Sequence, residues 1–68
     1  MEATIKLDQF LKRVGAVMSG GEAKHLIQGG SVSVNGEVET RRGRQLREGD
    51  RVTIEGQAFV VQDLRDSQ

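Results

Sequence analysis

Residues 31–40 read SVSVNGEVET, two runs in which polar and apolar side chains alternate, joined by an Asn-Gly pair. Alternation with a period of two favours half-buried strands, and Asn-Gly favours a tight hairpin turn. A two-residue loop at Asn35-Gly36 would put Val32 and Val38 on opposite faces, whereas a three-residue loop Val34-Asn35-Gly36 pairs them on one face. We therefore predict the three-residue loop, with Gly36 left-handed and both valines in the core.

A second hairpin is predicted in residues 52–61. Apolar and polar residues alternate again, and Gly56-Gln57 suits a two-residue turn that has Gly first. This register pairs two residues of each strand on one face: Val52 with Val61 and Ile54 with Phe59. We expect the C-terminal strand over residues 58–62.

Residues 7–14 have the spacing of an amphipathic helix. Their apolar side chains recur at positions i, i+3, i+4 and i+7: Leu7, Phe10, Leu11 and Val14. Asp8 comes early and Lys12 and Arg13 come late, which is the order that the helix dipole favours. Gly15 follows where a C-terminal cap belongs, so we predict a short helix that ends there.

A second helix is predicted to begin after Ser19. The Ser19 hydroxyl can accept from the Glu22 amide while the Glu22 carboxylate accepts from the Ser19 amide, as in a capping box, and Met18 can form a hydrophobic staple with Ala23. The helix is expected to end at Gly29-Gly30. Three residues are expected to face inward and three outward: Ala23, Leu26 and Ile27, and then Lys24, His25 and Gln28.

Together these elements predict an α+β fold, in which two short N-terminal helices pack on a small, mainly antiparallel sheet of three to five strands. Neither helix is long enough to persist alone. A chain of 68 residues has room for one small core. We expect a single domain over residues 1–68, with its core motif in about residues 5–55 and fraying in the first few residues and in residues 65–68.

Charge is unevenly distributed along a chain whose formal net charge is zero. Four arginines fall in a stretch without an acid: Arg41, Arg42, Arg44 and Arg47. Clustered arginine favours a phosphate-bearing partner, because its planar fork binds phosphate bidentately. The alternative reading of the same run is a solvated turn, and charge alone leaves both open.

Catalytic and metal chemistry lack their usual residues. The chain has no Cys, which is typical of a reducing compartment, and His25 is its single histidine, so a catalytic triad or multi-histidine metal site is not expected. Residues 20–24 lack the spacing of a nucleotide-binding phosphate loop. The glycine pair Gly20-Gly21 nevertheless exceeds what a capping box needs, which hints at an anion near the free amides. We predict no enzyme activity and no cofactor or metal.

Four blocks of the sequence carry a family resemblance over nearly the whole chain. They are residues 5–12 (IKLDQFLK), 19–24 (SGGEAK), 32–38 (VSVNGEV), and Leu46 with 48–52 (EGDRV). In order and spacing the blocks resemble the S-four (S4) RNA-binding domain, also called the alpha-L motif. The strings at 21–24 (GEAK) and 41–46 (RRGRQL) are similar to the stand-alone YaaA/YbcJ-like group, which has been linked to ribosome maturation.

The resemblance implies an RNA-contact surface on the two helices and the loop after the first hairpin. Its residues would be Lys6, Lys12 and Arg13 at the first helix, Ser19, Gly20, Gly21, Lys24 and Gln28 at the second, and Arg41, Arg42 and Arg44 in the loop. The cations would contact phosphates, and the amides of residues 19–21 an anion or a sugar. Family members often carry a basic residue where this chain has Gly20 and Gln45. Replacing the three loop arginines with Glu is expected to abolish binding and leave the fold intact.

The leading hypothesis is a bacterial, cytoplasmic and monomeric RNA-binding protein that contacts structured RNA, with ribosomal RNA during subunit assembly as the leading target. No membrane and no small-molecule substrate are expected. A protein-interaction adaptor that retains the scaffold is the alternative, and a small-anion or nucleotide binder is a third. DNA binding is disfavoured, because neither helix has the side chains of a major-groove recognition helix.

Overall fold

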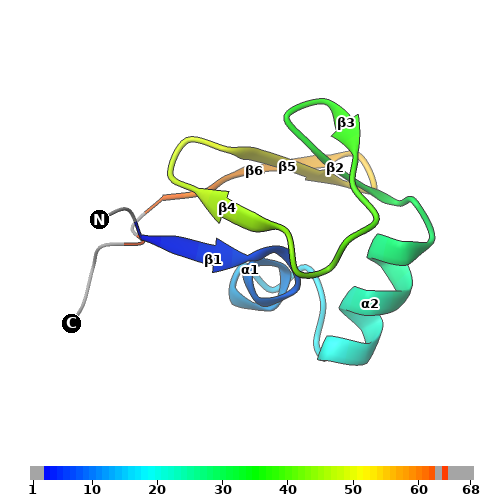
Figure 1. The fold of residues 1–68 in the computed structure, drawn as a ribbon. Helices are drawn as coiled ribbons and strands as arrows, with labels where there is room; N and C mark the ends of the chain where they lie inside the picture. The colour runs from blue at the N-terminus through cyan, green and yellow to red at the C-terminus, as the bar shows by residue number, and fades with distance from the viewer. Residues whose placement is uncertain (1–2, 63, 65–68) are drawn as a thin grey trace.

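The structure is a computed structural model that describes residues 3–62 and 64, and this part of the chain forms two helices and six short strands (Figure 1). Strand β1 runs directly into the first helix. The bounds in chain order are β1 Thr4–Lys6, α1 Leu7–Arg13, α2 Gly20–Gln28, β2 Val32–Val34, β3 Glu37–Val38, β4 Gln45–Arg47, β5 Arg51–Ile54 and β6 Gln57–Val60. None of the helices in the described residues is long and apolar enough to cross a membrane.

The strands form two antiparallel sheets, one of β1 and β4 and one with the order β3-β2-β5-β6. The structure confirms the α+β class and the two N-terminal helices, and it divides the strands between two sheets. Strand β1 is not predicted from the sequence, and its three residues are ordered by pairing with β4, more than thirty-five residues along the chain. Residues 65–68, which are expected to fray, lie outside the described residues. Sequence periodicity cannot signal strands this short.

The core lies between the helices and the inner faces of the two sheets. Both helices contribute the faces that their spacing predicts, and Leu46 of β4 is fully buried beside them. The buried residues are Leu7, Phe10, Leu11, Val17, Ala23, Ile27, Val32, Val34, Leu46, Val52, Ile54 and Val61. Because burying one aliphatic side chain stabilises a protein by about 1.5–3 kcal/mol, these few residues hold a small domain together.

The predicted register of the first hairpin is wrong. The loop has two residues, and Val34 pairs with Glu37 while Ser33 pairs with Val38. Asn35 and Gly36 both have positive φ, 52° and 88°, as a type I′ turn requires, so Gly36 is left-handed as predicted. Asn35 is held in this conformation because its side-chain oxygen accepts from the Arg51 amide at 2.9 Å. Val38 therefore points outward and is 62% exposed.

The predicted register of the second hairpin is also wrong. Its turn is Glu55-Gly56, with φ of 51° and 84°, so Ile54 pairs with Gln57 and Val52 with Phe59. Two positive φ values again match the twist of a type I′ hairpin, and Glu55 adopts one of them although it is not glycine. Strand β6 consequently spans Gln57–Val60 rather than 58–62. Val61 is buried beyond the end of the strand, where its amide donates to the Asp50 carbonyl at 2.9 Å.

Candidate nucleic-acid interface

The loop between β3 and β4, residues 39–44, is called the arginine loop below. Its carbonyls accept from the first turn of α1: the Leu7 amide donates to Arg44 at 2.8 Å and the Asp8 amide to Arg42 at 3.2 Å. No side chain caps α1 at Lys6, so these carbonyls take the place of a cap. The pairing of Lys6 with Gln45 in the β1–β4 sheet brings Lys6 to the same edge. The structure thus joins one predicted cation of the first helix to the loop arginines.

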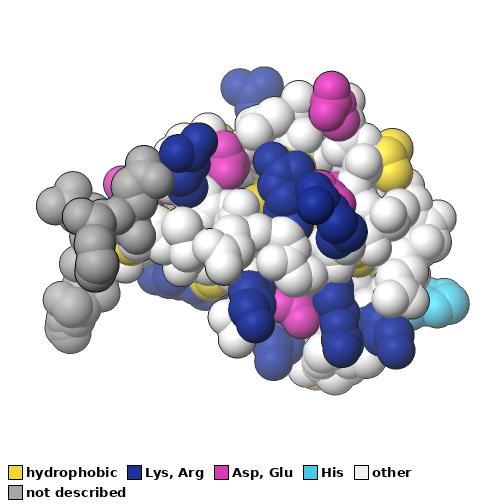
Figure 2. Space-filling view, in the orientation of Figure 1, with side chains coloured by type: hydrophobic (Ala, Val, Ile, Leu, Met, Phe, Trp, Pro, Cys, Tyr) yellow, Lys and Arg dark blue, Asp and Glu magenta, His cyan; other side chains and the backbone are white. Residues whose placement is uncertain are grey.

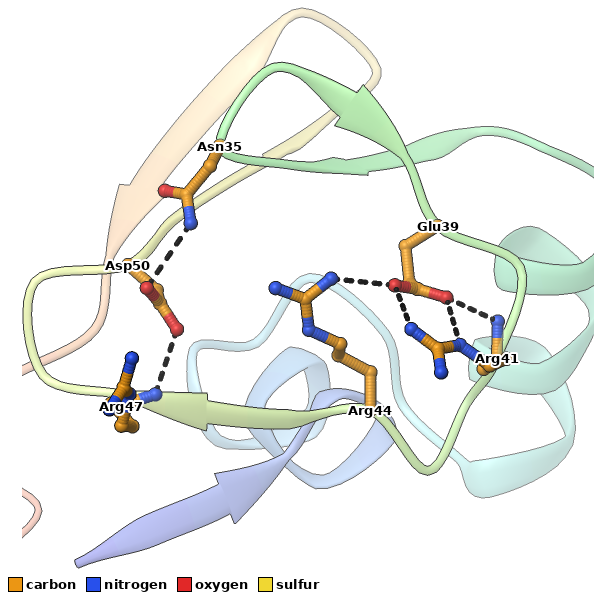
Figure 3. A network of polar contacts seen from close by, with 6 residues as sticks. All are labelled: Asn35, Glu39, Arg41, Arg44, Arg47 and Asp50. Atoms are coloured by element: carbon orange, nitrogen blue, oxygen red, sulfur yellow. Dashed lines mark hydrogen bonds and ion pairs between the residues drawn. The ribbon is translucent and has the colours of Figure 1, made fainter. Parts of the chain in front are cut away.

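Glu39 is the buried centre of the arginine loop (Figure 3). Its carboxylate accepts from Arg41 Nε at 2.9 Å and Nη2 at 3.2 Å, from the Arg41 amide at 3.0 Å, and from Arg44 Nη1 at 2.7 Å. Hydrogen bonds from Arg41 first and then from Arg44 lower the pKa of Glu39 from 4.5 to about 2, although burial raises it. The two arginines therefore face an ionised carboxylate at neutral pH.

Sequence reasoning missed Glu39, and the hairpin register explains why. The Glu39 amide donates to the Val32 carbonyl at 2.9 Å, so Glu39 lies opposite Val32 on the inner side of the hairpin. The predicted register put Val38 in that place. A shift of one residue exchanges the two faces of a strand, so the predicted register places the Glu39 carboxylate on the exposed face. The available signal was the Asn-Gly pair, whose commonest hairpin is the two-residue type.

A second network lies at the other end of β4 and orders its exit. Asp50 accepts from the Arg47 amide at 2.8 Å and from the Asn35 side chain at 3.2 Å (Figure 3). Burial raises the pKa of Asp50. These hydrogen bonds and the nearby positive charges of Arg44 and Arg47 together lower it by more, so the pKa of Asp50 lies below its ordinary value. Both ends of β4 are thus fixed by a carboxylate.

The start of α2, residues 18–24, is organised locally. The Ser19 hydroxyl accepts from the Glu22 amide at 3.1 Å, which confirms the predicted cap. The Glu22 carboxylate accepts from the Met18 amide at 2.9 Å instead of the Ser19 amide, and Met18 is 93% exposed, so the predicted staple with Ala23 is wrong. The chain enters α2 with the Met18 side chain exposed to solvent, and the Glu22 carboxylate accepts the hydrogen bond of the Met18 amide.

The space above the glycine pair is open. A Cβ atom at Gly20 would meet nothing within 4 Å, and one at Gly21 would meet only the Ser19 hydroxyl at 3.9 Å. Packing therefore does not require glycine at either position. Lys24 and His25 are exposed one turn further along α2.

The remaining predicted contact residues lie near the C-terminal ends of the two helices. Lys12 and Arg13 are exposed in the last turn of α1, about 10 Å along the helix from Lys6. Arg13 lines a shallow hollow with Phe10 and with β6 residues, including Phe59. Gln28 is exposed at the last residue of α2. The structure thus brings Lys6 to the edge that carries the arginine loop, and the other positions lie on α1 and α2 or just before α2.

Figure 2 shows that Lys and Arg side chains gather over the centre and lower part of one face, with few acidic side chains between them. The single histidine marks the right-hand edge of this face. Gln45 is exposed, and its side-chain oxygen accepts from the Thr4 hydroxyl at 3.2 Å. Basic residues are common at this position in the family that the sequence resembles. Within residues 3–62 and 64, no three His, Asp or Glu side chains converge as a metal site would require.

The chain matches one family model and is similar to proteins from two organisms. The family model described as "S4 domain" matches residues 1–62. The chain is 50% identical over 52 residues to a "Probable ribosome maturation protein RlbA" of Bacillus subtilis (strain 168), a match that covers 76% of this chain and 73% of that protein. It is 43% identical over 49 residues to an "Uncharacterized RNA pseudouridine synthase" of Aquifex aeolicus (strain VF5), covering 72% of this chain but 16% of the synthase.

A solved structure has the same fold. The crystal structure of the 30S ribosomal protein S4e from Thermoplasma acidophilum superposes with a TM-score of 0.67 and 18% sequence identity. The match covers 90% of this chain and 32% of that protein. At this level of identity the likeness concerns the arrangement of helices and strands.

Proposed function

Because the chain belongs to the S4 domain family, we propose that it is a non-enzymatic RNA-binding protein whose target is structured ribosomal RNA during maturation of the ribosome. The relative named as a probable ribosome maturation protein supports this role. The observation that carries the proposal is the fixed arginine loop, where three arginines and one acid lie beside Lys6. We assign the activity to the monomer and to the cytoplasm.

The proposed contact surface has a centre and a periphery. Lys6 and the loop arginines form the centre, where they contact phosphates as charged donors. The amides and side chains at the start of α2 approach the sugar-phosphate backbone from the side. The peripheral residues are Lys12, Arg13, Ser19, Gly20, Gly21, Lys24 and Gln28.

The aromatic residues favour recognition of shape over recognition of single bases. The chain has two, and Phe10 is 3% exposed while Phe59 is half-buried. Proteins that bind unstacked bases use exposed aromatic rings as stacking platforms. Without such a platform, the backbone of a folded or double-stranded RNA is the better target.

A salt titration of binding to a structured RNA hairpin tests the proposal, with single-stranded RNA and duplex DNA as comparisons. We expect preference for the hairpin and a log–log slope that corresponds to roughly three to six phosphate contacts, at about 0.7–0.9 per contact. Absence of binding to all three at low salt would contradict the proposal. The adaptor alternative, which the exposed Val38 and Val60 favour, would then be tested by retention of a partner protein after nuclease treatment.

Arg42 is the residue to test first, because its described contact to the rest of the protein runs through its backbone carbonyl. Arg42→Glu is expected to weaken hairpin binding by about tenfold or more and to reduce the salt slope by about 1–2. The control is Arg51→Glu, the same charge change on the exposed face of β5, which should alter affinity less than about threefold. Equal effects of the two variants would indicate attraction by net charge alone.

Replacing all three loop arginines with Glu is a poorer test than the sequence suggests. Arg41 and Arg44 compensate the buried charge of Glu39, so their replacement by acids would leave that carboxylate unpaired. A buried charge without its partner is strongly destabilising. We therefore expect the triple variant to lose stability together with binding.

A further inference from the structure

Glu39 is an acid within the proposed contact surface and lowers its positive charge, but its carboxylate lies beneath the arginines. Its side chain is 8% exposed, whereas the side chains of Arg41 and Arg44 are 74% and 33% exposed. A solvated acid would only weaken attraction for phosphate. This carboxylate instead contacts both arginines from inside, so their outer edges stay accessible.

The shared oxygen sets the relation between the two guanidinium groups. Nη2 of Arg41 and Nη1 of Arg44 both donate to Oε1 of Glu39, at 3.2 and 2.7 Å. The two groups consequently lie side by side, as Figure 3 shows. Arg41 donates to Glu39 from Nε and Nη2, so its Nη1 remains available to a phosphate. Arg44 donates to Glu39 from Nη1, so its Nε and Nη2 remain available.

The backbone beneath these side chains is also fixed. The Arg44 amide donates to the Arg41 carbonyl at 3.2 Å, and the Arg42 and Arg44 carbonyls accept from the first turn of α1. The backbone that carries the arginines is therefore held by a second element, and the side chains of Arg41 and Arg44 are held by Glu39. Side chains and backbone together present two adjacent guanidinium groups in one arrangement.

We propose that Glu39 is a positioning residue that holds Arg41 and Arg44 as a preformed clamp for one RNA phosphate group, so that removing its negative charge weakens RNA binding. This inference rests on the proposed function. Two opposing effects decide whether loss of the Glu39 charge strengthens or weakens RNA binding. Loss of the acid raises the attraction of the loop for RNA, but this effect is screened by salt. Loss of the carboxylate also frees two long side chains, whose ordering must then occur on binding.

Glu39→Gln and Glu37→Gln provide the test, because each removes one negative charge and they lie two residues apart. Glu37 is exposed at the hairpin, so we expect Glu37→Gln to bind the RNA hairpin as tightly as the wild type or up to about twofold more tightly. For Glu39→Gln we expect binding about five- to tenfold weaker, with a similar salt slope. Amide NMR spectra and thermal unfolding verify that each variant is folded at the temperature used.

The outcomes separate the two proposals. If the wild type does not bind the hairpin, the proposed function is contradicted and the clamp with it. If the wild type binds and Glu39→Gln binds equally or more tightly, the clamp alone is overturned. Should Glu39→Gln fail to fold, Arg41→Lys and Arg44→Lys carry the test, since lysine keeps the charge but lacks the fork. The clamp predicts that both lysine variants bind the RNA hairpin more weakly than the wild type with an unchanged salt slope. Wild-type affinity in these variants would overturn it.

Discussion

The arginine loop and the start of α2 both present polar and cationic groups to solvent, but they are held in different ways. At α2 the hydroxyl and carboxylate that order the backbone act within four residues and are exposed. In the arginine loop, a buried carboxylate holds the side chains and contacts to α1 hold the backbone. The first arrangement depends on local sequence, whereas the second depends on the whole fold. Damage at a distance should therefore affect the loop and spare the helix start.

The largest effect is expected from removing the core residue beneath the arginine loop. Leu46 is fully buried in β4, opposite Ile5 of β1. Leu46→Ala should lower the free energy of unfolding by about 2–4 kcal/mol, measured by urea titration, because it leaves a cavity where the two-stranded sheet meets the core. Val38→Ala, at an exposed position, should cost less than about 1 kcal/mol. A loss below about 1 kcal/mol at Leu46 would show that the loop does not depend on the core.

Acid should act next, through Glu39. Its folded-state pKa of about 2 lies below the ordinary 4.5, so the stabilisation is fully present above about pH 4.5 and is lost as the pH falls towards 2. We expect a loss on the order of 2 kcal/mol, because hydrogen bonds to a charged group disappear. Chemical unfolding at several pH values measures it. The decline should be shallower in Glu39→Gln, and an equally steep decline in that variant would assign it to other groups.

The smallest effect is expected at the start of α2. Ser19→Ala removes the cap and should cost about 1 kcal/mol, which lowers Tm by about 4–8 °C. Ser19→Asp keeps a capping oxygen, so its Tm should stay near that of the wild type. If phosphate approaches this helix start, Ser19→Asp should bind RNA several-fold more weakly while Ser19→Ala binds normally. Wild-type RNA affinity in both variants would remove Ser19 from the contact surface.

These two regions also differ in how well the sequence predicts them. The helices, the inward-facing residues of α2 and the Ser19 cap follow from patterns within a few residues, and all are confirmed. The paired strands β1 and β4 have three residues each and come from distant segments, so no local periodicity could reveal them. The family resemblance, which rests on the order and spacing of four sequence blocks, is confirmed by the S4 domain match over residues 1–62.

The errors in the two hairpins differ. In the first, the register that buries Val32 and Val38 together places Glu39 outside, and in the second a two-residue turn is expected one residue too late, at Gly56-Gln57. The turn residues decided otherwise, because Asn35-Gly36 and Glu55-Gly56 both form two-residue turns with positive φ. A carboxylate can occupy the inner position only because two arginines from the following loop compensate its charge. That compensation is a tertiary interaction, which hydrophobic patterning does not anticipate.

The contacts between the arginine loop and the first turn of α1 also constrain the order of folding. Helix α1 has seven residues, too few for a stable isolated helix, and its first amides have their partners in residues 42 and 44. During synthesis these partners emerge about 35 residues after the helix itself. We therefore expect α1 to become stable only after the arginine loop has been made. Helix and loop then form in one cooperative step, so the basic face is assembled only in the complete fold.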